Sequence, residues 1–140
     1  MERIDIQTEE QKTLHELASR TIESIKRLSQ PVVRACGPLT TGGLGYEENA
    51  RRLRLAEEIL EKKGFTVFKF DDAEVEIKDK NYPHADVMNY FHKPVLESGL
   101  IQEAYFLSGW NGSKGATWEH DFVEQSTVME VQDFPEEWFK

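Results

Sequence analysis

Cysteine is nearly absent from the chain, since Cys36 is the single thiol among 140 residues. One thiol excludes an internal disulfide and argues against a zinc site built from cysteine ligands. Basic residues are also few compared with acidic ones. The sequence has 17 Lys and Arg residues and 26 Asp and Glu residues, which gives a net charge of -9 at pH 7. The sequence therefore lacks the basic surface that binds a nucleic-acid backbone or an anionic membrane, and we expect neither partner.

Long apolar runs are absent as well. No stretch approaches the roughly 20 apolar residues that span a membrane. The acidic beginning, MERIDIQTEEQK, lacks the apolar segment of a secretory signal peptide. We therefore expect a soluble cytoplasmic protein, and its length of 140 residues corresponds to about one domain with a single core.

The sequence does contain alternating helical and strand patterns, recognised by apolar periods near 3.6 and by β-branched or aromatic runs. The predicted helices cover residues 8–29, 47–63, 85–97 and 115–125. The predicted strands cover residues 32–36, 65–70, 100–107 and 128–131. Pro94 should kink or divide its helix, and the polar stretch 71–84, which has no steady period, is predicted to be a loop.

This order of elements is typical of an α/β fold, because right-handed helical crossovers between parallel strands cover both faces of a sheet. We predict a three-layer fold with a mainly parallel sheet of four to five strands and helices on both faces, of the Rossmann or flavodoxin-like kind. Residues 1–30 would form an N-terminal helical extension, and residues 31–140 the domain itself.

Two glycine-rich loops follow predicted strands, GPLTTGGLG at 37–45 and GWNGSKG at 109–115. Ligands of open α/β sheets bind beyond the carboxyl ends of the strands, and glycine lets backbone N–H groups approach a sugar or a phosphate. Neither loop is a standard nucleotide motif, because the first lacks the lysine of a P-loop and its glycines do not fit the dinucleotide fingerprint. An ordinary surface loop is an equal alternative for both.

Glu119 is the candidate reacting group. If a helix starts near Ser113, then Ala116, Glu119 and Val123 lie on one stripe of small and apolar residues, and the carboxylate points inward. The alternative is a solvated glutamate in an early helical turn, where the helix dipole stabilises it modestly. On spacing alone, the solvated carboxylate is the stronger interpretation.

A family resemblance changes that balance. The stretches ACGPLTTGGLGYEEN (35–49), GFTVFKF (64–70) and YFLSGWNGSKGATWEHDF (105–122) together resemble the nucleoside 2-deoxyribosyltransferase-like superfamily. The similarity is to a phage-frequent branch that pairs a GP-[LM]-T loop with GW-x-x-S-x-GA-x-x-E, and it covers about residues 32–131. Enzymes of this superfamily move 2-deoxyribose between nucleobases, and relatives hydrolyse the N-glycosidic bond of deoxynucleoside 5'-monophosphates.

The resemblance implies that Glu119 is the nucleophile, since a carboxylate can capture C1' from an oxocarbenium-like state as a covalent glycosyl-enzyme. It also bears on the substrate. Six residues before the nucleophile, the transferases carry an aspartate that holds sugar hydroxyls, and the monophosphate hydrolases carry a serine, which here is Ser113. A hydroxyl beside helix N–H groups suits a phosphate dianion, although Ser113 could instead cap the helix or do both.

The sequence has no counterpart of the residue that donates a proton to the base in the superfamily. Members of the superfamily carry an aspartate shortly before the third strand, and the aligned stretch HKPVLESGLIQE contains none. Asp86 and Glu97 are the predicted catalytic substitutes, with Glu103 as a further carboxylate. His92 could also fill the role, although an isolated histidine is more often structural.

Other side chains could contact the substrate. Tyr46 and Asn49 could contact ribose or base, but Asn49 could simply satisfy loop backbone groups. Trp110 could stack on a base or belong to the core, and Cys36 is expected to be buried packing. The predicted substrate-binding set is Gly37, Pro38, Leu39, Thr40, Gly43, Tyr46, Asn49, Gly109, Trp110, Ser113, Gly115 and Ala116.

These observations predict an N-glycosidase or deoxyribosyltransferase that acts on a nucleoside or nucleotide, with a nucleoside 5'-monophosphate favoured. No metal or organic cofactor is implied. The resemblance also implies a homodimer or larger homo-oligomer, whose interface the aromatic tail FPEEWF (134–139) could serve. The alternative is a non-catalytic nucleotide-binding or regulatory module on the same fold, which the missing aspartate supports.

Overall fold

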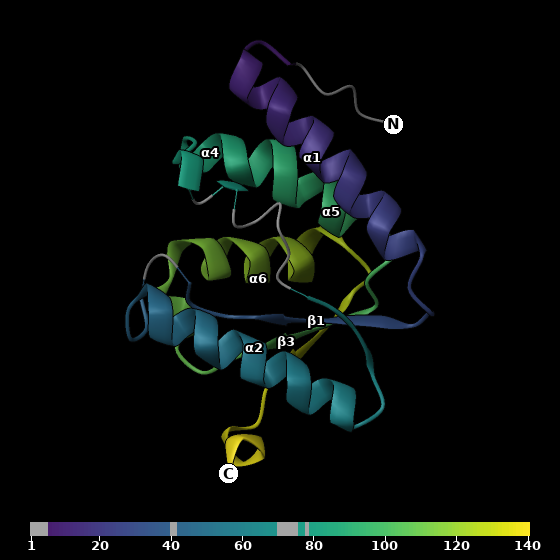
Figure 1. Cartoon of the computed structure of the whole chain (residues 1–140), viewed down its shortest axis with the longest axis vertical. Coiled ribbons are helices and arrows are strands. Elements are labelled where there is room, and N and C mark those ends of the chain that lie inside the picture. Colours follow the sequence, from purple (N-terminus) through teal and green to yellow (C-terminus); the bar gives the residue numbers. More distant parts are fainter. Residues whose placement is uncertain (1–5, 40–41, 70–75, 78) are drawn as a thin grey trace.

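The computed structural model describes residues 6–39, 42–69, 76–77 and 79–140. It is an α/β fold on a four-stranded, all-parallel sheet with strand order β2-β1-β3-β4 (Figure 1). The strands are β1 (Val32–Cys36), β2 (Thr66–Phe68), β3 (Glu103–Phe106) and β4 (Glu130–Asp133). The helices are α1 (Glu9–Lys26), α2 (Tyr46–Lys62), α4 (His84–Asp86), α5 (Lys93–Glu97) and α6 (Lys114–Ser126), with the π-helical segment η1 (Val87–His92) and the 3-10 helices η2 (Trp110–Gly112) and η3 (Glu136–Phe139).

β1 is an interior strand and is buried along its whole length. Because side chains alternate along a strand, Val32 and Cys36 join one apolar cluster, and Val33 and Ala35 join another. In Figure 1, α2 lies on one side of the sheet, and α1, α4, α5 and α6 lie on the other. The predicted α/β class with a parallel sheet of four strands is confirmed.

α1 covers the helices that precede β3. Thr8 is its N-cap, since its side chain accepts a hydrogen bond from the Gln11 backbone N–H at 3.1 Å. Leu14, Leu17 and Ile25 are buried in the same apolar cluster as β1 and β3. The helix begins one residue after the predicted start and ends three residues before the predicted end at residue 29.

The predicted helix over 85–97 is divided into three consecutive segments, α4, η1 and α5. Pro94 accounts for the division, because it has no N–H to donate to the carbonyl of Tyr90 one α-helical turn earlier. Instead, the N–H of Lys93 donates to the carbonyl of Met88, five residues back, which is the π-helical pattern. The π segment sets the direction in which the side chain of its last residue, His92, points.

Three strands differ from the predicted boundaries, with β2 and β3 shorter than expected and β4 shifted. β4 begins at Glu130 instead of Val128, because a turn closes α6 first. Thr127 Oγ1 donates to the Val123 carbonyl at 2.8 Å and accepts from the Met129 N–H at 3.2 Å. This turn leaves Val128 99% exposed, so it cannot start a buried strand.

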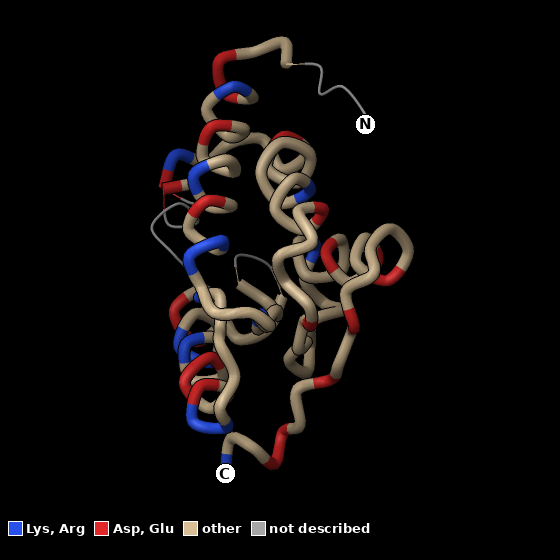
Figure 2. Tube along the Cα trace, turned by 90° about the vertical axis from the view of Figure 1, so that its right-hand side faces the viewer, with Lys and Arg blue, Asp and Glu red and all other residues tan. Residues whose placement is uncertain are grey.

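Part of the predicted loop 71–84 is helical. Residues 76–77 and 79–80 have helical backbone, and α4 begins at His84, whereas residues 70–75 and 78 lie outside the described part. None of the helices in the described ranges is long and apolar enough to cross a membrane. Figure 2 shows basic and acidic residues interspersed along α1 and α2.

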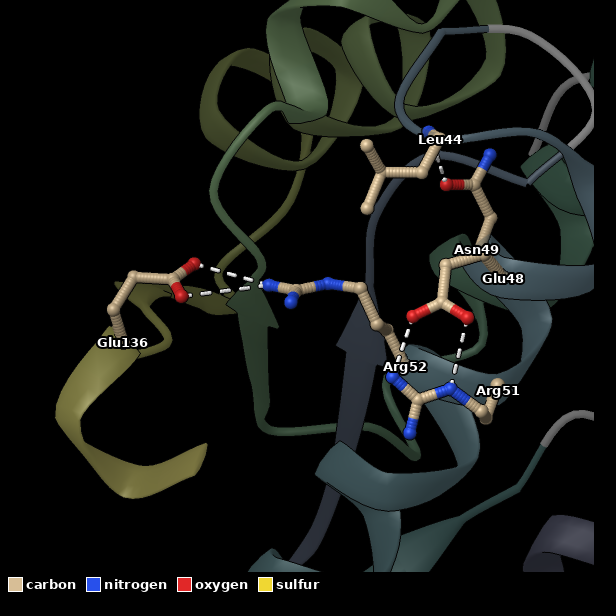
Figure 3. A network of polar contacts seen from close by, with 6 residues as sticks. All are labelled: Leu44, Glu48, Asn49, Arg51, Arg52 and Glu136. Atoms are coloured by element: carbon tan, nitrogen blue, oxygen red, sulfur yellow. Dashed lines mark hydrogen bonds and ion pairs between the residues drawn. The ribbon is translucent and has the colours of Figure 1, made fainter. Parts of the chain in front are cut away.

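The aromatic C-terminal segment folds back on α2. The Lys63 ammonium lies 4.2 Å from the centre of the Trp138 ring, and the Arg52 guanidinium lies 4.5 Å from the centre of the Phe139 ring. Arg52 also donates to the Glu136 carboxylate at 3.1 Å (Figure 3). The tail that was expected to serve a subunit interface therefore has partners within its own chain.

Candidate active site

A pocket of about 600 Å³ opens beyond the carboxyl end of β1. It is lined by the end of this strand, the first turns of α6, and side chains from α2, α4 and η1. This is the edge of a parallel sheet at which open α/β folds bind ligands. The predicted site residues that line it are Gly37, Leu39, Ser113, Gly115, Ala116 and Glu119.

Glu119 lies on the buried face of α6. Ala116, Glu119 and Val123 are 4%, 8% and 1% exposed, so the three residues do form one inward-facing stripe. The helix begins at Lys114, directly after Ser113, close to the predicted start. The expected inward stripe is confirmed, and the alternative of a solvated carboxylate is wrong.

The two oxygens of the Glu119 carboxylate have different surroundings. Oε2 accepts a hydrogen bond from Cys36 Sγ at 3.3 Å and lies 3.5 Å from Arg34 Nε. Oε1 lies 3.9 Å from His92 Nδ1, which is beyond hydrogen-bond distance. Two side chains of β1 therefore hold one oxygen, and the other faces η1.

These contacts keep the carboxylate ionised. Burial raises the pKa of Glu119, but the charges of Arg34 and His92, with hydrogen bonds from Cys36 and Arg34, outweigh burial and bring the pKa below its ordinary value. For Cys36 the balance is opposite, because burial and the nearby carboxylate raise the thiol pKa well above its usual value. Near neutral pH the site therefore combines a carboxylate with a protonated thiol that donates to it.

Arg34 and Cys36 reach Glu119 because they occupy alternate positions of β1 and so face the same side of the sheet. The Arg34 side chain is 10% exposed, and its guanidinium lies 5.3 Å from the centre of the Phe68 ring on β2. A buried arginine inside an otherwise apolar strand is costly unless it is paired. The pairing with Glu119 meets that requirement.

Asn49 holds the first glycine-rich loop in shape. Its side-chain amide donates to the carbonyls of Leu39 and Gly42 at 3.0 and 3.1 Å. Its carbonyl oxygen accepts from the Leu44 N–H at 3.0 Å (Figure 3). Asn49 is 4% exposed, so this residue satisfies loop backbone groups, which is the simpler of the two roles considered for it.

The two glycine-rich loops lie against each other. Gly42 has a φ of +71°, and a Cβ at this position would collide with the backbone carbonyl of Gly112 in the second loop. Gly43 has a φ of +64°, and a Cβ there would collide with Asn49 and Pro38. Both positions require glycine because of this close approach, although residues 42–45 are themselves exposed.

Trp110 is directed away from the pocket. Its ring stacks on the His120 imidazole with centroids 3.9 Å apart and planes at 10°. It also meets the Phe106 ring edge-on at 5.8 Å and belongs to the apolar cluster beneath α6. The structure thus gives Trp110 a packing role at this site, which was the alternative to base stacking.

The start of α6 forms another wall. Ser113 is the N-cap, since its hydroxyl accepts from the Ala116 N–H at 3.3 Å, and it is 4% exposed. Lys114 and Gly115 follow it along the pocket. The positive end of the α6 dipole and the Lys114 ammonium therefore make this wall favourable for an anion.

The two carboxylates predicted to donate a proton lie outside the pocket. Asp86 Oδ1 accepts a hydrogen bond from Gln11 Nε2 of α1 at 3.2 Å. Glu97 is exposed at the end of α5, and the helix that precedes a parallel strand ends at the amino edge of the sheet, opposite the pocket. Glu103 begins β3 at that same edge. Topology therefore separates Glu97 and Glu103 from Glu119.

The other predicted substrate-binding residues that the structure describes do not line this pocket. Pro38, Gly43, Asn49 and Gly109 line a smaller hollow of about 290 Å³. Tyr46 is half-buried in the first turn of α2 and does not line either pocket. Thr40 lies outside the described residues.

Sequence reasoning missed two charged groups of the pocket, Arg34 and Glu57. Arg34 lies in the middle of the apolar run that predicts β1. Glu57 is 5% exposed and lies on the buried face of α2. Both residues could have been found from the sequence, because each places a charged side chain at a position where the strand or helix pattern calls for an apolar residue. His92 was considered as a possible proton donor, and its position at the end of η1 brings it to Glu119.

Across the described residues, no group of three or more His, Cys, Asp and Glu side chains is arranged to hold a metal ion. No protein-family model, curated protein or solved structure matches the chain.

Proposed function

We propose that this protein cleaves the N-glycosidic bond between a nucleobase and (deoxy)ribose, as an N-glycosidase or deoxyribosyltransferase acting on a nucleoside 5'-monophosphate. The proposal follows the resemblance to the nucleoside 2-deoxyribosyltransferase-like superfamily. It includes the three-layer form of that fold for residues 31–140, with α1 as an extension, and a homo-oligomer without a metal or organic cofactor. The observation that carries it is the buried carboxylate of Glu119 beside a pocket of about 600 Å³.

The electrostatics of the site support a nucleophilic role. A carboxylate must be ionised to attack, and the pKa of Glu119 is held below its ordinary value in spite of burial, because Arg34 and His92 outweigh the cost. Oε2 is held by the side chains of β1, so Oε1 is the oxygen that can reach a substrate. An oriented, ionised and largely desolvated carboxylate suits attack on a carbon that develops positive charge.

The reaction proceeds in two displacements. The Oε1 lone pair forms a bond to C1' while the bond from C1' to the base nitrogen breaks and its electron pair leaves with the base. The resulting glycosyl ester is then opened at C1' by water, in a hydrolase, or by the nitrogen of a second base, in a transferase. Glu119 is regenerated as a carboxylate in both cases.

Two walls of the pocket match the two ends of a nucleotide. The apolar wall suits the flat face of a nucleobase, and the N-terminal end of α6 suits a phosphate through Ser113, Lys114 and the helix dipole. The separation of an apolar and a cationic wall favours a nucleotide over a free base. The apolar wall consists of Ile77, Tyr82, Val87 and Met88.

The test is release of free base from a panel of deoxynucleoside 5'-monophosphates and the corresponding nucleosides, followed by chromatography. Glu119→Gln should reduce the rate by at least about 10³-fold, because it removes the nucleophile. Glu124→Gln is the matched control, since Glu124 lies on the same helix with a 64% exposed side chain, outside the pocket. Absence of base release and base exchange across the whole panel would remove the catalytic proposal.

A second candidate is a nucleotide-binding module without catalysis. It is favoured by the contacts of Glu119 with Arg34 and Cys36, because an ion pair of this kind could serve only to neutralise a buried arginine. Calorimetry distinguishes the two functions. Nucleotide binding of equal affinity to wild type and Glu119→Gln, without turnover by either, would favour the binding module.

A further inference from the structure

The proposed cleavage needs a proton for the departing base, because a nucleobase leaves poorly as an anion. The aspartate that this chemistry would use is missing, and Asp86 and Glu97 lie outside the pocket. The pocket itself brings a different group to the reacting carboxylate. His92 of η1 lines the pocket and lies 3.9 Å, Nδ1 to Oε1, from Glu119.

We propose that His92 is the general acid and base of this site: as imidazolium it protonates the leaving base, and as imidazole it activates the water that follows. The inference rests on the proposed function, and it chooses His92 over the carboxylates Asp86 and Glu97, which the sequence analysis favoured as proton donors.

The geometry separates the two partners by a useful distance. At 3.9 Å, Nδ1 of His92 and Oε1 of Glu119 are within ion-pair distance but beyond hydrogen-bond distance. Retaining glycosidases keep their nucleophile and their acid about 5–5.5 Å apart, measured between carboxyl groups, with the reacting carbon between them. The 3.9 Å joins the two facing atoms of His92 and Glu119, so it is shorter than a separation measured between whole side-chain groups.

His92 is held in place by its surroundings. Its side chain is 14% exposed, and its ring meets the Phe91 ring edge-on with centroids 5.0 Å apart. It is the last residue of the π segment that Pro94 imposes, and such segments occur often at functional sites. A regular α-helix would direct residue 92 differently, so the irregular backbone has a consequence at the site.

Other ionisable groups of the pocket fit the role less well. Cys36 donates to the nucleophile itself, and burial raises the pKa of its thiol well above the usual value, so it holds its proton too tightly. His84 is exposed in α4, and Lys114 is exposed at the start of α6, where the proposal gives it to the phosphate. Glu57 extends from α2, not from the helices around η1.

The proton balance closes over both steps. As the bond between C1' and the base breaks, the base nitrogen takes the proton from the His92 imidazolium, and the base leaves neutral. The imidazole then removes a proton from water while the water oxygen bonds to C1' and the bond to Glu119 Oε1 breaks. The products are free base and sugar phosphate, with Glu119 ionised and His92 protonated again.

Leaving-group dependence tests this role directly. A purine methylated at N7 already carries the positive charge that protonation would supply, and a 5-fluorinated pyrimidine leaves more readily as an anion. Base release is therefore measured for the best nucleotide of the panel and for its activated form. The proteins compared are wild type, His92→Gln, Glu119→Gln, and His120→Gln as the matched control, since the His120 side chain is 16% exposed and stacks on Trp110.

We expect His92→Gln to lose about 10²–10⁴-fold in kcat/KM for base release on the ordinary nucleotide and less than about tenfold on the activated one, because kcat/KM for base release reports only the first step and leaves out the activation of water. Glu119→Gln should lose both activities, and His120→Gln neither. Equal losses of His92→Gln on both substrates, or no loss on either, would overturn the role of His92 while leaving the glycosidase proposal intact. If wild type cleaves neither substrate, the proposed function fails, and this inference fails with it.

Discussion

Val33 and Ala35 face α2 and contact apolar neighbours, whereas Arg34 and Cys36, which alternate with them on β1, face a carboxylate on α6. Both sides of this strand are buried. The side toward α2 gains its stability from apolar area removed from water. The side toward α6 instead buries a charge pair, which contributes little net stability compared with apolar packing of the same volume. The comparison indicates that β1 packs against apolar neighbours on both faces, and that the face toward α6 also holds the ion pair of the pocket.

Burial therefore has a different meaning on the two faces. On the α2 side, Leu60 is 0% exposed among apolar neighbours and needs no further explanation. On the α6 side, Glu119 is nearly as buried but needs Arg34 to remain ionised. A fold that required only stability would have placed apolar residues at both positions. The retained charges fit the proposed chemistry and also fit neutralisation of the buried Arg34, and the tests of the two candidate functions separate these explanations.

The largest expected effect on stability comes from breaking the pair on the α6 side. Arg34→Met should lower the free energy of unfolding by about 4 kcal/mol near pH 7, because it leaves Glu119 buried without its guanidinium partner. Urea denaturation measures the change. The double variant Arg34→Met/Glu119→Leu should recover most of the loss, since the unpaired charge is then gone. If the double variant is less stable than Arg34→Met, the pair contributes more than we infer.

A cavity on the α2 side should have a slightly smaller effect of a different kind. Leu60→Ala should cost about 3 kcal/mol in unfolding free energy, because it removes apolar contacts and leaves a void. The rate of base release per folded molecule should stay at the wild-type value, since Leu60 lies outside the pocket. Activity loss in fully folded Leu60→Ala would contradict the separation of the two faces.

The smallest expected effect is on the loss of stability in acid, compared between wild type and Glu119→Gln. The pKa of Glu119 is lowered in the folded protein, so the unfolded chain, with a glutamate pKa of about 4.3, binds this proton first as the pH falls. The stability contributed by the ionised carboxylate is therefore complete above that pH and is lost as the pH falls through the folded-state pKa. Denaturation at pH 7 and pH 3 should show a larger decrease for wild type than for Glu119→Gln. Equal decreases would mean that the carboxylate is not stabilised by its neighbours.

The strands and the reacting helix were predictable because their patterns are local. The β-branched run 32–36 predicted β1 with its observed ends, and the spacing of Ala116, Glu119 and Val123 placed them on one stripe of α6, although spacing alone favoured a solvated Glu119. β4 was misjudged because Val128 is apolar yet belongs to a turn, which Thr127 closes through its side chain. Apolar character alone does not distinguish a strand residue from an exposed turn residue.

The partners of Glu119 were not predictable in the same way, because they depend on tertiary contacts. Arg34 is found only when the neighbour of β1 across the pocket is known, and Glu97 is excluded only when its helix is seen to end at the opposite edge of the sheet. The direction of His92 depends on a π segment, in which neither the helical nor the strand period applies. The spacing placed Glu119 on one stripe with Ala116 and Val123, the family resemblance made it the candidate residue, and topology identified its surroundings.

The central claim is that Glu119 forms a bond to the sugar. The most direct measurement is mass spectrometry of the protein quenched during turnover of a 2-fluorinated nucleotide analogue, which slows release of the sugar from the enzyme. We predict that the peptide containing Glu119 gains the mass of one sugar phosphate, and that Glu119→Gln gains none. Base release without any modification of that peptide, or with the sugar attached to another residue, would contradict the claim.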